Sequence, residues 1–113
     1  MSSPTVYATE VRRVRDAGLE TSDIAAATGS DPTTVVAWMA SRRSPTGERR
    51  MRLIDLSAIV ERLREVMDPG YVPIWLNKPV KALDDERPID LIGRGDSRAV
   101  LRLVAQLEND TFS

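Results

Sequence analysis

Prolines at positions 73, 79 and 88 divide the C-terminal part of the chain into short segments. A proline inside a helix removes a backbone hydrogen bond and clashes with the preceding turn, so no helix between these positions can exceed about two turns. Helices that short persist only when they pack against other elements. The same stretch is nevertheless rich in apolar residues, namely Tyr71, Ile74, Trp75, Leu76, Leu83, Ile89, Leu91 and Ile92. Either all of them close a small core, or, as we expect, part of this surface binds another polypeptide.

The composition excludes several classes of protein. With 113 residues, 42% hydrophobic and 29% charged, the chain is expected to form one domain, or two small ones that share a core. It contains no cysteine and no histidine, which removes disulfides, zinc sites and histidine-based catalysis. We therefore expect no enzyme, no catalytic residue, no metal and no cofactor. No apolar run approaches the roughly 20 residues that cross a bilayer, and the N-terminus lacks signal-peptide features, so a cytoplasmic protein without membrane contact is expected.

Residues 21–40 predict two short helices joined by a turn. Thr21 or Ser22 is expected to cap the first helix, and Asp31 with Pro32 to open the second as N-cap and first helical residue. A preceding helix is expected to stop at Gly18 after placing Val6 on its apolar face. The inward-facing positions of the pair and its turn are Ile24, Ala25, Gly29, Val35 and Trp38. Their spacing resembles the helix-turn-helix of the Xre/Cro-like regulators.

The second of these helices would enter the major groove if the pair binds DNA. Its outward positions hold no Arg, Lys, Asn or Gln, the side chains that make strong bidentate base contacts. Residues 42–52, in contrast, contain five arginines and one acid, a pattern suited to phosphates. The alternatives are DNA binding with weak base readout, or a hairpin followed by a solvated arginine loop. The candidate DNA-binding residues are Thr33, Thr34, Val36, Arg42, Arg43, Arg49 and Arg50.

A long helix is predicted from Glu48 to Met67, ending at Asp68-Pro69-Gly70. Its apolar residues are spaced three and four apart at Leu53, Leu56, Val60, Leu63 and Met67, with Ile54, Ile59 and Val66 widening the face. This apolar face is broader than packing against a single helix requires. The helix is therefore either a core element or, along part of its length, a dimer interface. It divides the chain into three parts, residues 1–47, 48–68 and 69–113.

The C-terminal part carries a pattern of residues that resembles a known family. The pattern is Trp75-Leu76, Pro79, Leu83, Pro88-Ile89-Asp90-Leu91-Ile92, Gly95, Val100 and Leu103. It resembles the toxin-binding domain of the Xre/MbcA/ParS-type antitoxins, and the helix pair in front matches the domain order of that family. The resemblance implies an all-α fold in which an N-terminal helix-turn-helix bundle is joined by a long helix to a small helical toxin-binding domain.

The resemblance also implies a partner and a mechanism. The partner would be a RES-domain toxin that degrades NAD, and the C-terminal tail of the antitoxin would block the active site of the toxin. Asp110 stands where relatives tend to have glycine. By resemblance, the toxin-binding residues are Trp75, Leu76, Pro79, Leu83, Arg94, Arg98, Arg102, Asp110, Thr111, Phe112 and Ser113.

The sequence therefore favours the antitoxin of a type II toxin-antitoxin system. We expect a homodimer within a hetero-oligomer that contains the cognate toxin, and binding to promoter DNA as a further role. The alternative is an Xre/Cro-like transcriptional regulator that has no toxin partner.

Overall fold

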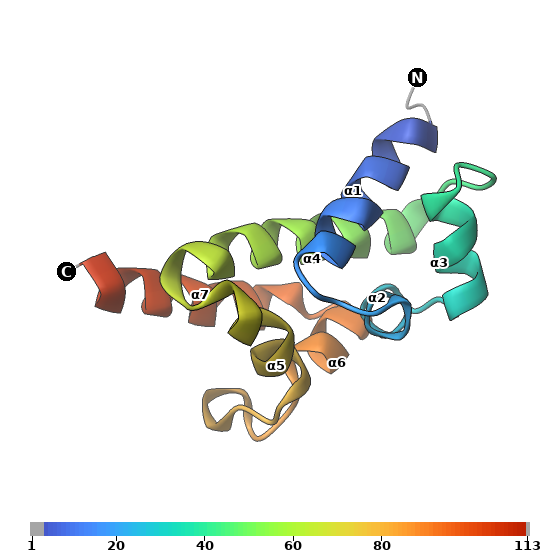
Figure 1. Ribbon diagram of the computed structural model, residues 1–113. Coiled ribbons are helices and arrows are strands. Elements are labelled where there is room, and N and C mark those ends of the chain that lie inside the picture. Colours follow the sequence, from blue (N-terminus) through green and yellow to red (C-terminus); the bar gives the residue numbers. More distant parts are fainter. Residues whose placement is uncertain (1–3, 113) are drawn as a thin grey trace.

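The computed structural model describes residues 4–112, and the side chains of residues 6–111. Over this range the chain is predominantly helical (Figure 1). Its extents are 43 × 24 × 24 Å. An isolated bridge between Val80 and Glu86 is the single strand-like pairing in the described part. The predicted all-α class is confirmed. The elements are α1 (Pro4–Asp16), α2 (Thr21–Thr28), α3 (Pro32–Met39), α4 (Gly47–Val66), η1 (Pro69–Tyr71), α5 (Val72–Asn77), η2 (Lys81–Leu83), α6 (Pro88–Gly93) and α7 (Ser97–Phe112), where η denotes a 3₁₀ turn.

The prolines act as helix starters in the C-terminal half. Pro69, Pro73 and Pro88 each occupy the first or second position of η1, α5 and α6. At these positions the missing N–H costs no helical hydrogen bond, because the first amides of a helix have no partner within it. As predicted, α5 and α6 are short, with six residues each.

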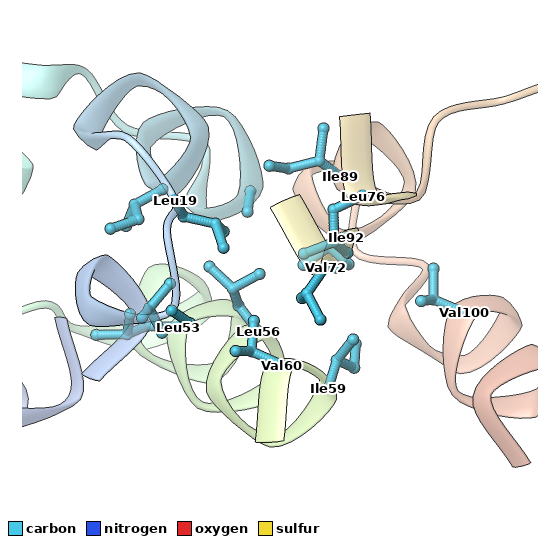
Figure 2. Packing of buried hydrophobic residues seen from close by; sticks show 14 of the residues in the cluster. Leu19, Leu53, Leu56, Ile59, Val60, Val72, Leu76, Ile89, Ile92 and Val100 are labelled. Carbon is cyan, nitrogen blue, oxygen red and sulfur yellow. The ribbon is translucent and has the colours of Figure 1, made fainter. Parts of the chain in front are cut away.

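Helix α4 is the central element of the core. Its buried side chains lie between Leu19 of the N-terminal half and the side chains of α5, α6 and α7, such as Leu76, Ile92 and Val100 (Figure 2). α2 also packs on α6, and α4 packs along α7. One continuous hydrophobic cluster therefore spans both halves of the chain.

The α2–α3 pair forms as the sequence indicates, with one difference in capping. Gly29 takes the left-handed conformation at the end of α2, with a φ of 72°, and the Asp31 carboxylate accepts a hydrogen bond from the Thr34 amide at 2.8 Å. The cap of α2 is Glu20, and neither Thr21 nor Ser22 as predicted. The Glu20 amide donates to the Asp23 carboxylate at 2.8 Å in a reciprocal capping box.

Two expectations about burial are wrong. Val6 is 53% exposed, and Tyr7 takes the inward position on α1 instead. Most of the apolar load of the proline-divided stretch is buried within this chain, so the predicted surplus is small. It amounts to Tyr71 and Ile74, which are 37% and 55% exposed.

The face of α4 that carries Leu53, Leu56, Val60 and Leu63 is fully buried in the core of this chain. Ile54, which the spacing assigns to that face, is 45% exposed. The seam predicted from the heptad spacing is therefore an internal packing surface of this chain. No helix in the described range is long and apolar enough to cross a membrane.

Candidate functional site

A groove runs between η2 and α7 in the C-terminal half. A hollow of about 270 Å³ is lined by Ala82, Leu83, Ala99, Arg102, Leu103 and Gln106. A second hollow, of about 370 Å³, shares Ala82, Leu83 and Ala99 with the first and extends to Arg94. The shared lining makes the two hollows one surface, which we call the η2–α7 groove.

Local backbone chemistry builds the wall of the groove. Val80 and Glu86 pair across a tight loop, and the backbone folds back through Asp84 and Asp85, with φ values of 57° and 63°. Aspartate adopts this left-handed conformation more readily than most residues. Leu83 is 8% exposed and ties the loop to the core. The opposite wall is the first half of α7.

Charged side chains of both signs form the rim of the groove: the second hollow is lined by Arg94, Asp84, Glu86 and Asp96, and the first by Arg102. Arg94 pairs with Glu86, with 3.0 Å between Nη1 and Oε2, whereas Arg98 and Arg102 are exposed one turn apart on α7. Within the described side chains, neither Arg98 nor Arg102 forms an ion pair with a carboxylate. The Arg102 guanidinium beside the apolar floor of Leu83, Ala99 and Leu103 can bind a segment that carries both apolar and acidic side chains.

The structure brings together only some of the residues predicted to bind a toxin. Leu83 lines both hollows of the groove, Arg94 lines one and Arg102 lines the other, whereas Arg98 on α7 lines neither. Pro79 is exposed on the loop between α5 and η2, but it does not line the groove.

Trp75, Leu76 and Leu83 are buried, at 7%, 0% and 8% exposure, so these three side chains hold the core and offer little surface to a partner. The groove also contains residues that the sequence reasoning missed. Ala99, Leu103 and Gln106 lie three and four positions apart along α7, a spacing that marks one helix face. This signal was available in the sequence. The opposing wall at Ala82 comes from a loop that has no periodicity to detect.

Residues 110–112 of the predicted C-terminal tail belong to helix α7. The helix continues through Asp110 and Thr111 to Phe112, and the Thr111 hydroxyl donates to the Leu107 carbonyl oxygen at 2.9 Å. Asp110 and Thr111, which the resemblance assigns to the blocking tail, are therefore helical in this structure. Ser113 and the side chain of Phe112 lie outside the described residues.

Glu108 makes the last ion pair between α7 and the rest of the described chain. Its carboxylate accepts two hydrogen bonds from Arg62 on α4, at 3.0 and 2.5 Å. The Arg62 hydrogen bonds lower the pKa of Glu108 below its ordinary value of 4.5. Beyond this pair, residues 109–111 are exposed to solvent.

A second surface lies at the other end of the molecule. Arg42 and Arg43 follow α3, and Arg49 and Arg50 occupy the first turn of α4; all four are exposed, and we call them the basic end. In the described part of the chain, none of the four forms an ion pair with a carboxylate. The pKa of Asp31 is lowered mainly by the hydrogen bond from the Thr34 amide, and also by the charges of Arg49 and Arg43. The charges of Arg49 and Arg43 therefore act on Asp31, the N-cap of α3.

The outward face of α3 offers fewer candidate DNA-contacting side chains than predicted. Thr33 and Val36 are exposed, with Val36 at 40%. Thr34 is only 8% exposed, so its side chain is directed into the protein and our assignment of Thr34 to a DNA-facing surface is wrong. In the part of the chain that the structure describes, no group of His, Cys, Asp or Glu side chains is arranged to hold a metal ion.

Comparisons with known proteins place this geometry in context. No protein-family model matches the chain. Mycobacterial cidal antitoxin MbcA from Mycobacterium bovis, and the proteins of that name from two strains of Mycobacterium tuberculosis, are each 26% identical to it over 95 residues. Each match covers 84% of this chain and 84% of the relative.

A solved structure extends the match to the fold. A chain in the crystal structure of the M. tuberculosis MbcT–MbcA toxin-antitoxin complex aligns with a TM-score of 0.82, covering 96% of this chain and 98% of that one. The chain is similar to MbcA in sequence and in fold. The resemblance inferred from the C-terminal residues is therefore confirmed, and it extends over the N-terminal helices as well.

Proposed function

We propose that this chain is the antitoxin of a type II toxin-antitoxin system and that it inactivates a cognate protein toxin by direct binding. The observation that carries the proposal is the alignment of 96% of the chain with a chain of the MbcT–MbcA toxin-antitoxin complex. In this role the chain needs neither catalytic residue nor cofactor, and it acts in the cytoplasm.

The η2–α7 groove is the docking surface in this proposal. Its apolar floor and Arg102, with Arg98 exposed one turn earlier on α7, suit a partly apolar segment of the toxin that places an acidic side chain on this side of the groove. By the family resemblance, the toxin has a RES domain and degrades NAD. Trp75, Leu76 and Leu83 act indirectly, because they hold the walls of the groove in place.

The C-terminal end of α7 supplies the active-site block. Residues 109–111 lie beyond the Arg62–Glu108 pair, so this last turn can leave the helix without breaking that tertiary contact. An isolated helical turn is only marginally stable in water, so its unwinding costs little. We propose that residues 110–113 enter the toxin cleft in this way, while the Arg62–Glu108 pair keeps the rest of α7 attached to α4.

Co-expression with the toxin encoded beside this chain tests the proposal. The wild-type chain should restore growth and co-purify with the toxin. Replacing Arg98 and Arg102 together by glutamate should weaken the complex at least about ten-fold, because like charges then face the acidic segment. Removing residues 111–113 should abolish neutralisation and leave the helical circular dichroism spectrum intact.

The double variant Arg42→Glu and Arg43→Glu is the matched control, because it changes the same charge at the opposite end of the molecule. It should neutralise the toxin as the wild type does. The absence of a complex between the wild-type chain and the toxin would refute the antitoxin proposal. Neutralisation that survives the truncation would refute the active-site block alone.

A second role, autoregulation of the operon, is favoured by the basic end. The four arginines of the basic end are exposed and can contact phosphates, whereas Thr33 and Val36 offer little base readout. We therefore propose DNA binding that is strongly dependent on salt and only weakly dependent on sequence. The rival function, a transcriptional regulator without a toxin, uses the same surface.

Fluorescence anisotropy with promoter and scrambled duplexes tests this second role. The double variant Arg42→Glu and Arg43→Glu should reduce the slope of log affinity against log salt by about one per lost phosphate contact. The double variant Arg98→Glu and Arg102→Glu should leave the slope unchanged. If both double variants behave like the wild type, the basic end does not bind DNA.

A further inference from the structure

Arg52 on α4 has a guanidinium group that the fold largely buries. Its side chain is 20% exposed. The group lies between two glycines that have a positive φ. Nη1 is 2.8 Å from the position that a Cβ atom at Gly29 would take, and Nη2 is 3.5 Å from the equivalent position at Gly95. A side chain at Gly29 would displace the guanidinium, so the glycine leaves the space that the guanidinium occupies.

The hydrogen-bonding capacity of this guanidinium is largely unused within the chain. Its ion pair is with Glu48, at 3.6 Å between Nη2 and Oε2, which is too long for a hydrogen bond, and the Glu48 side chain is 86% exposed. Among the residues that the structure describes, none accepts a hydrogen bond from the Arg52 side chain. A guanidinium has five N–H donors, and a buried charge is costly unless it is paired. Acceptor atoms from outside the described chain, of water or of a ligand, therefore complete its contacts.

A hollow of about 440 Å³ opens beside this guanidinium, and we call it the Arg52 hollow. Its lining is formed by Gly47, Glu48, Arg50, Met51, Arg52, Asp55 and Gly95. The charges of the two arginines and the two acidic residues cancel. Asp55 is half-buried, and in the part of the chain with described side chains it forms no ion pair with Arg52 or with another base. The hollow thus presents a cation and an anion that do not pair with each other.

The chemistry of this lining selects the class of ligand. A phosphate dianion is attracted by the arginines but repelled by Glu48 and Asp55. A ligand without net charge that carries one carboxylate and one ammonium group matches both signs. The carboxylate fits the planar fork of the Arg52 guanidinium, and the ammonium group fits the carboxylate of Asp55. These two residues are three positions apart on α4, so they are neighbours on one helix face.

We propose that the Arg52 hollow binds a free aliphatic amino acid as its zwitterion. The ligand carboxylate accepts hydrogen bonds from Arg52 in place of Glu48, whose exposed side chain is free to move aside. The ligand ammonium group donates to Asp55, and the exposed Met51 contacts the aliphatic side chain of the ligand. The volume of the hollow lies in the range of pockets that hold small molecules. The hollow shares no lining residue with the η2–α7 groove, so the proposal does not depend on the antitoxin role.

A chemical-shift titration by NMR of the full wild-type chain with leucine and two analogues tests the ligand class. Isocaproate lacks the ammonium group of leucine, and isoamylamine lacks its carboxylate. Leucine should bind saturably, with a dissociation constant of about 1 mM or lower, and should shift the Gly95 amide signal. Each analogue should bind at least about ten-fold more weakly, because it leaves one charge of the lining without a partner. The absence of saturable leucine binding up to about 10 mM overturns the proposal, and so does an analogue that binds as tightly as leucine.

Two variants test which side chains hold the ligand. Arg52→Gln and Asp55→Asn should each weaken leucine binding at least about ten-fold, with circular dichroism as the check that they remain folded. Arg64→Gln is the matched control: Arg64 is on the same helix and has an ion pair of similar length, 3.7 Å to Glu61, but it does not line the hollow. It should bind leucine as the wild type does. Leucine binding that survives both substitutions in the hollow, or that is weakened equally in Arg64→Gln, overturns the proposal.

Discussion

At the scale of single residues, Gly93 has the tightest requirement. It lies at the end of α6, where this helix meets α2, and a Cβ atom there would be 2.3 Å from the carbonyl oxygen of Ala26. That distance is far below any van der Waals contact, and the obstructing atom belongs to the backbone. Only glycine therefore allows the two helices to approach this closely.

Replacing Gly93 by alanine should destabilise the protein by about 1–3 kcal/mol, because α2 and α6 must move apart. Chemical denaturation followed by circular dichroism measures the loss. Gly70→Ala is the control: its Cβ would meet the Asp68 carboxylate at 3.2 Å, a contact with an exposed side chain that a shift of a few tenths of an ångström relieves. The control should change stability by no more than about 0.5 kcal/mol. Equal losses for the two variants would mean that the α2–α6 contact is not tight.

At the scale of elements, the ion pair between Arg62 and Glu108 fastens the end of α7 to α4. The pKa of Glu108 is lowered by the Arg62 hydrogen bonds, and the pKa of Asp90 is lowered by its hydrogen bonds with Arg87. A carboxyl whose pKa is lower in the folded state binds protons more readily when the protein is unfolded. Such a carboxyl stabilises the folded protein at pH values above its ordinary pKa. This stabilisation is lost as the pH falls through the pKa that the group has in the folded state.

The free energy of unfolding should therefore stay nearly constant from about pH 7 to pH 5 and decrease below about pH 4.5. Glu108→Gln should lower stability at pH 7 and reduce the decrease below pH 4.5, because the variant has already lost the charged pair. Urea unfolding at a series of pH values measures both effects. Glu65→Gln, at an exposed position on the same α4 helix as Arg62, should follow the wild-type curve. If the stability of Glu108→Gln decreases below pH 4.5 as steeply as that of the wild type, other carboxyls cause the decrease.

At the scale of the whole molecule, one core joins two halves that the chain order would separate. α2 packs on α6 and α4 on α7, so each half lacks part of its core without the other. Fragments 1–68 and 69–113 should therefore be largely unfolded when they are expressed separately. The intact chain should unfold in a single transition.

The two tryptophans allow a test of this cooperativity, because Trp38 is buried in the N-terminal half and Trp75 in the C-terminal half. In Trp75→Phe the fluorescence reports on Trp38 alone, and in Trp38→Phe it reports on Trp75 alone. Within each variant, the fluorescence transition should coincide with the helical transition from circular dichroism. Separate transitions would show two independently stable domains.

The sequence by itself determined the features that depend on backbone chemistry within a few residues. Pro73 and Pro88 limit and open short helices, Gly29 makes the turn after α2, and Asp31 caps α3. These rules act over three or four positions, so the all-α class and the order of the helices followed from them. The N-cap of α2 was predicted wrongly at the same local scale, because Glu20, Thr21 and Ser22 are adjacent polar residues and each can cap a helix.

Tertiary structure alone decided which side of each helix is buried. Consecutive helical residues are about 100° apart around the axis, so a small rotation moves a side chain between core and solvent. Thr34 faces inward and Ile54 outward because of the helices packed beside them. The η2–α7 groove likewise exists only because a loop distant in sequence lies against α7. Local propensity fixes where helices begin and end, but burial depends on neighbours that are not adjacent in sequence.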